Sequence, residues 1–161
     1  MKKIVNIKKL LTPQEVDMLN ALGAEELKAS QAYLHLSNTM KTIGFFGAEK
    51  FFMAESDSER GHYSKLEAFM NDMNEQIEVP VLESQSEDID DLMGAFQFAI
   101  NMEMDLLGKY EDAYKMASPK MQALIHHFLE IQTEAVGEYG DLIARLSRTN
   151  EPILIDQELG K

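Results

Sequence analysis

Residues 45–73 read FFGAEKFFMAESDSERGHYSKLEAFMNDM, and this stretch decides how the rest of the chain can fold. Its apolar residues recur at alternating spacings of three and four, which is the pattern of a helix packed in a bundle. Three polar residues interrupt this apolar stripe, namely Glu55, Glu59 and His62. Glu59 and His62 are three residues apart, so on a helix they share one face and can bind one metal ion.

Three further segments carry the same stripe, and local signals mark where each helix begins. Thr12 can cap the first helix, with Glu15 completing a capping box. Ser118 before Pro119 marks another start. Residues 84–87 (SQSE) form a second capping-box pattern. We expect the four long helices at about residues 13–41, 45–73, 88–116 and 119–146.

The lengths of the connections predict the topology. The first and second helices, like the third and fourth, are joined by only a few residues, which makes antiparallel hairpins. The remaining connection, about 14 residues long, can span at most roughly 46 Å at ~3.3 Å per residue. A helix of about 29 residues is about 43 Å long, so this connection can cross the whole bundle. We therefore expect an all-α four-helix bundle with one long crossover between its second and third helices.

The 161 residues are expected to form one domain, since 45% are hydrophobic and that is enough for a sizeable core. Residues 1–11 should form an N-terminal arm and residues 12–147 the bundle. Residues 152–161 should form a short C-terminal helix or tail.

Each expected helix carries a polar residue near its middle. These residues are Glu26, Glu59, Glu103 and Gln132. Because all four are central, they meet in one layer whichever way each helix runs. Several carboxylates are costly to bury, and the imidazole of His62 cannot balance three of them, whereas divalent cations can. This set suits iron or manganese and also accepts zinc, and it can hold two ions if Glu59 or Glu103 bridges them.

Other polar residues are less informative. Glu55 lies one turn before Glu59 and is either an outer ligand of an additional iron site or a solvated side chain. The remaining histidines, His35, His126 and His127, are expected to be surface or packing residues.

The composition limits the kinds of partner that the protein can be expected to bind. The chain has 28 acidic and 15 basic residues and a net charge of −13, which suits cations and argues against a nucleic-acid partner. It has no cysteine, which excludes thiolate metal sites and fits a reducing compartment. No apolar run reaches the ~18 residues of a membrane span, and Met1–Leu11 lacks the apolar core of a signal peptide. We therefore expect a cytoplasmic protein without a membrane partner.

The sequence resembles the non-haem ferritins of bacterial type over residues 19–159. The motifs that carry the resemblance are Glu26-Leu27-x-x-Ser30-x-x-Tyr33, Glu59-Arg60-x-His62, Asn101-Met102-Glu103, and Gln132-x-x-Ala135 followed by Glu138-Tyr139-Gly140-Asp141. The ending Ile155-Asp156-Gln157-Glu158-Leu159 is similar to the tail of bacterial members.

The resemblance implies an iron-storage cage, usually a homo-oligomer of 24 subunits, in which each active bundle holds a di-iron ferroxidase centre. Glu26, Glu59 and His62 would ligate the first iron, and Glu59 would bridge to a second iron held by Glu103. Fe(II) would be oxidised by O2 or H2O2, and the Fe(III) would be stored as ferric mineral.

The same resemblance implies further roles. Gln132 would complete the metal site by hydrogen-bonding a ligand water or the oxidant, and Tyr33 matches a tyrosine that can supply an electron. Arg60 stands where bacterioferritins place the methionine that ligates haem, so no haem is expected. Ala135 stands where they place the histidine of a second symmetric site. Whether Glu134 belongs to an additional iron site stays open.

Two other functions remain open. One is a storage or structural subunit with little catalysis, against which the complete ligand set argues. The other is a ferritin-like di-metal oxidase or peroxidase that does not store iron in bulk. Assembly into a shell distinguishes storage from that alternative, since such an oxidase needs no hollow shell.

Overall fold

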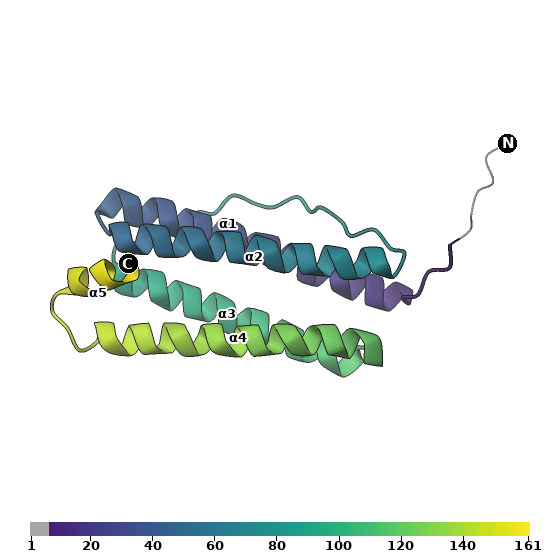
Figure 1. Cartoon of the computed structure of the whole chain (residues 1–161). Helices are drawn as coiled ribbons and strands as arrows, with labels where there is room; N and C mark the ends of the chain where they lie inside the picture. The colour runs from purple at the N-terminus through teal and green to yellow at the C-terminus, as the bar shows by residue number, and fades with distance from the viewer. Residues whose placement is uncertain (1–6) are drawn as a thin grey trace.

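The computed structural model describes residues 7–161 of the chain. The described part forms five helices: α1 (Pro13–Ile43), α2 (Phe46–Asp72), α3 (Leu92–Met116), α4 (Pro119–Leu146) and α5 (Pro152–Leu159). Figure 1 shows the hairpin of α1 and α2 lying against the hairpin of α3 and α4. Residues 73–91 run along the first hairpin from one end to the other (Figure 1). The expected four-helix bundle with a long crossover and a short fifth helix is thereby confirmed.

The start of α1 follows its sequence signals, and one of these residues also serves α4. Thr12 Oγ1 accepts a hydrogen bond from the Glu15 amide at 3.2 Å, and Glu15 Oε2 accepts one from the Thr12 amide at 3.0 Å. The other carboxylate oxygen of Glu15 accepts a hydrogen bond from the amide of Ser118 at 3.3 Å. Ser118 makes no side-chain cap of its own. One buried carboxylate therefore joins the beginnings of two helices.

The predicted start of α3 near Asp88 is wrong, as is the capping box at residues 84–87. α3 begins at Leu92, and its cap is Asp91, whose Oδ1 accepts a hydrogen bond from the Gly94 amide at 2.6 Å. The helix is therefore shorter than expected at its N-terminal end, and the crossover is longer.

Contacts with α1 explain why residues 84–87 do not start a helix. Gln31 Nε2 donates a hydrogen bond to the Glu83 carbonyl at 3.1 Å. His35 Nε2 lies 2.9 Å from the Glu87 carbonyl oxygen. The Glu87 carbonyl that bonds sideways to α1 is not available to a helix beginning at residue 84. The bond to Glu83 holds the preceding backbone against α1, so these distant partners outweigh the local signal.

The N-terminal arm falls only partly within the described residues, since residues 1–6 lie outside them. Residues 7–11 are not helical and lie at the end of α2, where the Leu10 amide donates a hydrogen bond to the Met73 carbonyl at 3.2 Å. Leu11 is buried in the core. Among residues 7–161, no helix is long and apolar enough to cross a membrane.

Two apolar clusters make up the core, and a polar layer separates them. On α2, Phe52 belongs to one cluster and Leu66 to the other, with Glu59 between them. The same change of cluster occurs on the other three long helices at Glu26, Glu103 and Gln132. The expected central layer of polar residues is therefore a feature of the folded core.

α5 packs across the beginning of α2. Asp156 Oδ1 accepts a hydrogen bond from the Ala48 amide at 2.7 Å and supplies the cap that Phe45 lacks. A Cβ atom on Gly47 would lie 1.7 Å from the Asp156 carbonyl oxygen, so only glycine permits this approach. The C-terminal helix thus completes the first turn of α2.

Gly47→Ala should displace α5 and lower the thermal stability of the protein. The added methyl group would overlap the backbone of Asp156, and the loss of the cap on α2 would cost about 1 kcal/mol. Calorimetric unfolding measures the change. Gly61→Ala is the matched control on the same helix because its Cβ would meet open space. A Gly47→Ala protein as stable as wild type would contradict the packing of α5 described above.

Glu15→Gln should destabilise the protein by about 1 kcal/mol at neutral pH, because an amide cannot accept hydrogen bonds at both positions. Burial raises the pKa of Glu15, but hydrogen bonds from Ser118 and Thr12 and the charge of Lys120 outweigh it and lower the pKa below 4.5. The contribution of Glu15 is therefore present above about pH 4.5 and is lost as the pH falls through the lowered pKa.

Thermal unfolding of both proteins from neutral to acid pH tests this expectation. The difference between wild type and Glu15→Gln should shrink in acid, whereas exposed Glu111→Gln should resemble wild type throughout. A difference that stays constant with pH would count against the double cap.

Candidate metal centre

Glu26, Glu59 and His62 come together in the polar layer between α1 and α2. One potential ligand atom from each lies within 4.8 Å of the other two. His62 Nδ1 lies 3.0 Å from Glu59 Oε2 and 3.4 Å from Glu26 Oε2. All three side chains are buried, and the imidazole packs edge-on against the ring of Phe128. Two carboxylates and an imidazole in this arrangement can bind a divalent cation.

Glu103 from α3 and Gln132 from α4 lie in the same layer but outside that trio. Both are fully buried. Gln132 Nε2 donates a hydrogen bond to Glu103 Oε2 at 2.7 Å, and the Tyr33 hydroxyl donates a short hydrogen bond to Glu103 Oε1. Both oxygens of Glu103 are therefore held by neighbouring side chains, and the amide of Gln132 orients this carboxylate.

Tyr110 is a site residue that the sequence reasoning missed. Its hydroxyl donates a short hydrogen bond to Glu26 Oε1, and its ring stacks on Phe128 at a centroid distance of 4.9 Å. Tyr33 on α1 thus holds the glutamate of α3, and Tyr110 on α3 holds the glutamate of α1. The two tyrosines belong to different apolar clusters and flank the layer from opposite sides.

A spacing of seven residues was the available sequence signal for these tyrosines. Tyr110 follows Glu103 by seven positions, just as Tyr33 follows Glu26. Seven residues are about two helical turns, so each tyrosine shares a face with the acid of its own helix. Tyr139 follows Gln132 at the same spacing.

The layer contains more acid than its imidazole can balance. Burial is the main cause that raises the pKa of Glu59 above its usual range. Burial, and then the charge of Glu59, raises the pKa of Glu103 to about 7. Burial lowers the pKa of His62, but the neighbouring carboxylates of Glu26 and Glu59 outweigh this effect and raise the pKa to about 10. The layer therefore retains protons at neutral pH that a bound divalent cation would displace.

No lysine or arginine in residues 7–161 lies within ion-pair distance of Glu26, Glu59 or Glu103. His62 is the one basic partner described for Glu26 and Glu59. Two buried oxygens, Glu26 Oε2 and Gln132 Oε1, also lack a hydrogen-bond partner within the described protein. Such atoms are uncommon in folded proteins and cost about 1–3 kcal/mol each. Oxygen acceptors of this kind suit a hard cation or its bound water, so the residues fit a metal ion.

The two glutamates whose roles the sequence left open differ in position. Glu55 lies half-buried at the edge of the layer, and the Tyr139 hydroxyl donates a hydrogen bond to its Oε2 at 3.5 Å. Burial raises the pKa of Glu55 to about 7, and the charges of Glu138, Glu59 and Glu103 add to this effect. Glu134 is exposed on α4.

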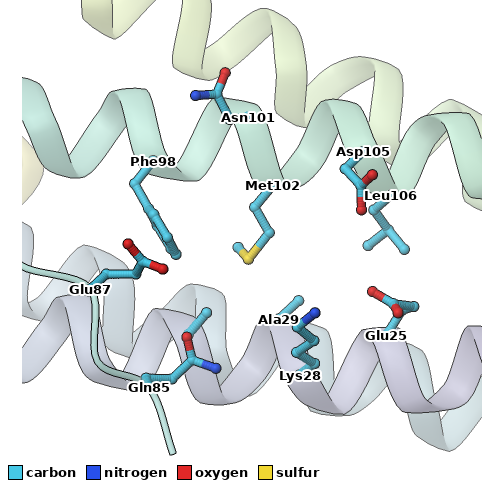
Figure 2. A pocket seen from close by; sticks show the side chains of 11 residues that line it. Glu25, Lys28, Ala29, Gln85, Glu87, Phe98, Asn101, Met102, Asp105 and Leu106 are labelled. Atoms are coloured by element: carbon cyan, nitrogen blue, oxygen red, sulfur yellow. The ribbon is translucent and has the colours of Figure 1, made fainter. Parts of the chain in front are cut away.

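A pocket of about 340 Å³ lies beside the layer, between α1, α3 and the crossover (Figure 2). Figure 2 shows Met102 pointing into the gap toward Ala29, and Glu25 facing Asp105 across it. Lys109 Nζ lies 2.8 Å from Glu25 and 2.7 Å from Asp105. Two of the three acids of the pocket are thus already paired with Lys109, which makes the buried layer the better candidate for metal binding.

Solved ferritin structures share this fold. The open-pore ferritin of the hyperthermophilic archaeon Archaeoglobus fulgidus superposes with a TM-score of 0.88 over 93% of this chain and 96% of that chain. An engineered closed form of the same ferritin also gives 0.88, over 94% of this chain and 97% of that chain. Both are 18% identical to this chain, so the likeness is one of fold.

Sequence comparison gives the family. Ferritin from Pacifastacus leniusculus is 31% identical over 146 residues, which cover 83% of this chain and 81% of that protein. The ferritin middle subunit of Salmo salar is 26% identical over 138 residues, covering 81% and 78%. The ferritin family model, described as a ferritin-like domain, matches residues 16–149. The chain therefore belongs to the ferritin family.

Proposed function

We propose that this chain oxidises Fe(II) at the polar layer of its own bundle and stores the product as ferric mineral. Membership of the ferritin family supports iron storage in general. The observation that carries the finer proposal is the buried trio of Glu26, Glu59 and His62, whose acids have no lysine or arginine partner among the described residues. Iron is the substrate, and O2 or H2O2 is the oxidant. The protein that holds the mineral is a cytoplasmic cage of 24 copies of this chain.

The ligand atoms suggest two unequal iron positions. Glu26, Glu59 and His62 would bind the first Fe(II), since their ligand atoms already converge. Glu59 would bridge to a second Fe(II) held by Glu103. Binding would release the protons that the layer keeps at neutral pH. The pair of ions would supply two electrons to the oxidant.

The neighbours of the ligands have positioning roles in this proposal. Tyr110 holds one oxygen of Glu26 through its hydroxyl, which leaves the other oxygen free for iron. Gln132 orients Glu103 and keeps its own Oε1 free to accept a hydrogen bond from a ligand water. Tyr33, in contact with Glu103, is the proposed electron donor. The apolar clusters on both sides keep bulk water away from the layer.

Glu59→Gln should slow aerobic Fe(II) oxidation by at least ~100-fold, because it removes the proposed bridging carboxylate. The metal-free variant should also be more stable than wild type. The folded-state pKa of Glu59 is raised, so its ionisation costs stability increasingly as the pH rises above about 4.5. Stopped-flow ferric absorbance and calorimetry measure the two effects.

Glu67→Gln, an exposed change on the same helix, is the matched control and should leave both quantities at their wild-type values. Size-exclusion chromatography establishes that each variant assembles. Wild-type oxidation kinetics in an assembled Glu59→Gln protein would remove Glu59 from the site.

Aerobic addition of Fe(II) to the purified assembly should yield soluble ferric iron far beyond the roughly two ions that a bundle centre can hold. The retained iron should co-elute with the protein in size-exclusion chromatography. Rapid oxidation that stops near two ions per subunit would instead identify a di-metal oxidase, and the storage proposal would fall.

A further inference from the structure

A second tyrosine lies behind Tyr33 on its side of the layer. Tyr139 of α4 stacks beside it, with ring centroids 6.2 Å apart and planes 17° apart. The Tyr33 hydroxyl donates to Glu103 Oε1, and the Tyr139 hydroxyl donates to Glu55 Oε2 at 3.5 Å. A series of neighbouring side chains therefore runs from Glu103 through the two stacked tyrosine rings to Glu55.

This series leads from the buried centre toward solvent. Glu103 and Tyr33 are fully buried and Tyr139 is 1% exposed, whereas Glu55 is half-buried. The other flanking tyrosine has no such continuation, since the one hydrogen bond described for the hydroxyl of Tyr110 is to Glu26. The two sides of the layer therefore differ, because among the described residues only the side of Tyr33 has a series of side chains that ends at a half-buried carboxylate.

Apolar rings isolate the middle of the series. Phe51 and Phe96 each lie 6.0 Å from Tyr139, and Phe52 lies 6.0 Å from Tyr33, measured between ring centroids. These rings keep water from the two hydroxyls, so a proton leaving Tyr139 has Glu55 as its acceptor. Closely packed rings are also a suitable arrangement for moving an electron over short steps.

We propose that Tyr139 and Glu55 form a relay that returns an electron to Tyr33 during iron oxidation. The relay rests on the proposed function, since Fe(II) is its reductant. Two Fe(II) ions reduce O2 only to hydrogen peroxide. Reduction of that peroxide to two water molecules needs two further electrons and two protons, and each passage along the relay supplies one electron.

In one passage, Tyr33 gives an electron and its hydroxyl proton to hydrogen peroxide. Tyr139 then gives an electron to the Tyr33 radical, which takes up a proton from solvent. The hydroxyl proton of Tyr139 moves to Glu55. A further Fe(II) ion reduces the Tyr139 radical and becomes Fe(III), and the proton returns from Glu55. The net change is one electron moved from Fe(II) to peroxide, whose proton comes from solvent.

Freeze-quench electron paramagnetic resonance during aerobic Fe(II) addition tests the relay. The Tyr33 radical is identified as the signal that Tyr33→Phe removes. Tyr139→Phe should prolong this signal by at least ~10-fold, since a positioned proton acceptor contributes roughly 10²–10⁴-fold to such steps. It should slow turnovers after the first iron load more than the first load itself. Glu55→Gln leaves both tyrosine rings in place, and it should also prolong the Tyr33 signal and slow the later turnovers.

Tyr63→Phe is the matched control, because Tyr63 is a buried tyrosine whose hydroxyl bonds to the Glu78 carbonyl away from the layer. Decay of the Tyr33 signal at equal rates in Tyr139→Phe and Tyr63→Phe would overturn the relay. Absence of a tyrosyl signal from both wild type and Tyr139→Phe would overturn it as well. Wild-type decay in Glu55→Gln would overturn its proton step. Failure of wild type to oxidise Fe(II) would instead overturn the proposed function.

Discussion

The burial of three carboxylates at the middle of an apolar bundle is the constraint on which the rest of this structure depends. Ionised groups in such surroundings are strongly unfavourable without a partner, and His62 lies within ion-pair distance of two of the three acids. Each long helix interrupts its apolar stripe at the same depth to build this layer. Burial of these acids therefore costs stability at the centre of the bundle, and it leaves oxygen ligands there that suit a divalent cation.

Most of the architecture was accessible from local sequence. Thr12 and Glu15 indicate the start of a helix because their hydrogen bonds join near neighbours. A modest error in the predicted helix ends also leaves the four polar residues at the middle of their helices, namely Glu26, Glu59, Glu103 and Gln132. The start of α3 was predicted wrongly because residues 84–87 carry an adequate local signal. The backbone at Glu83 and Glu87 is instead held by side chains of α1, some fifty positions earlier, and no local pattern encodes that competition.

The hydrogen-bond partners of the tyrosine hydroxyls were the part of the site that could not be predicted from the sequence. A tyrosine on a bundle stripe looks the same whether its hydroxyl is needed or only its ring. Tyr110 and Tyr139 became informative once the helices were placed, because their partners Glu26 and Glu55 lie on other helices. Asp156 is a similar case, since it caps α2 from the far end of the chain.

The two hydrogen bonds on Glu103 have a consequence for how iron would be sensed. An ion at the second position must compete with Tyr33 and Gln132 for the oxygens of this carboxylate, whereas the first position offers a free oxygen on Glu26. The first position would fill at low iron and the second only at higher iron. Since two-electron chemistry needs both, the oxidation rate would rise more steeply than iron concentration. Such a bundle would act as a threshold device that spares scarce iron and removes a surplus.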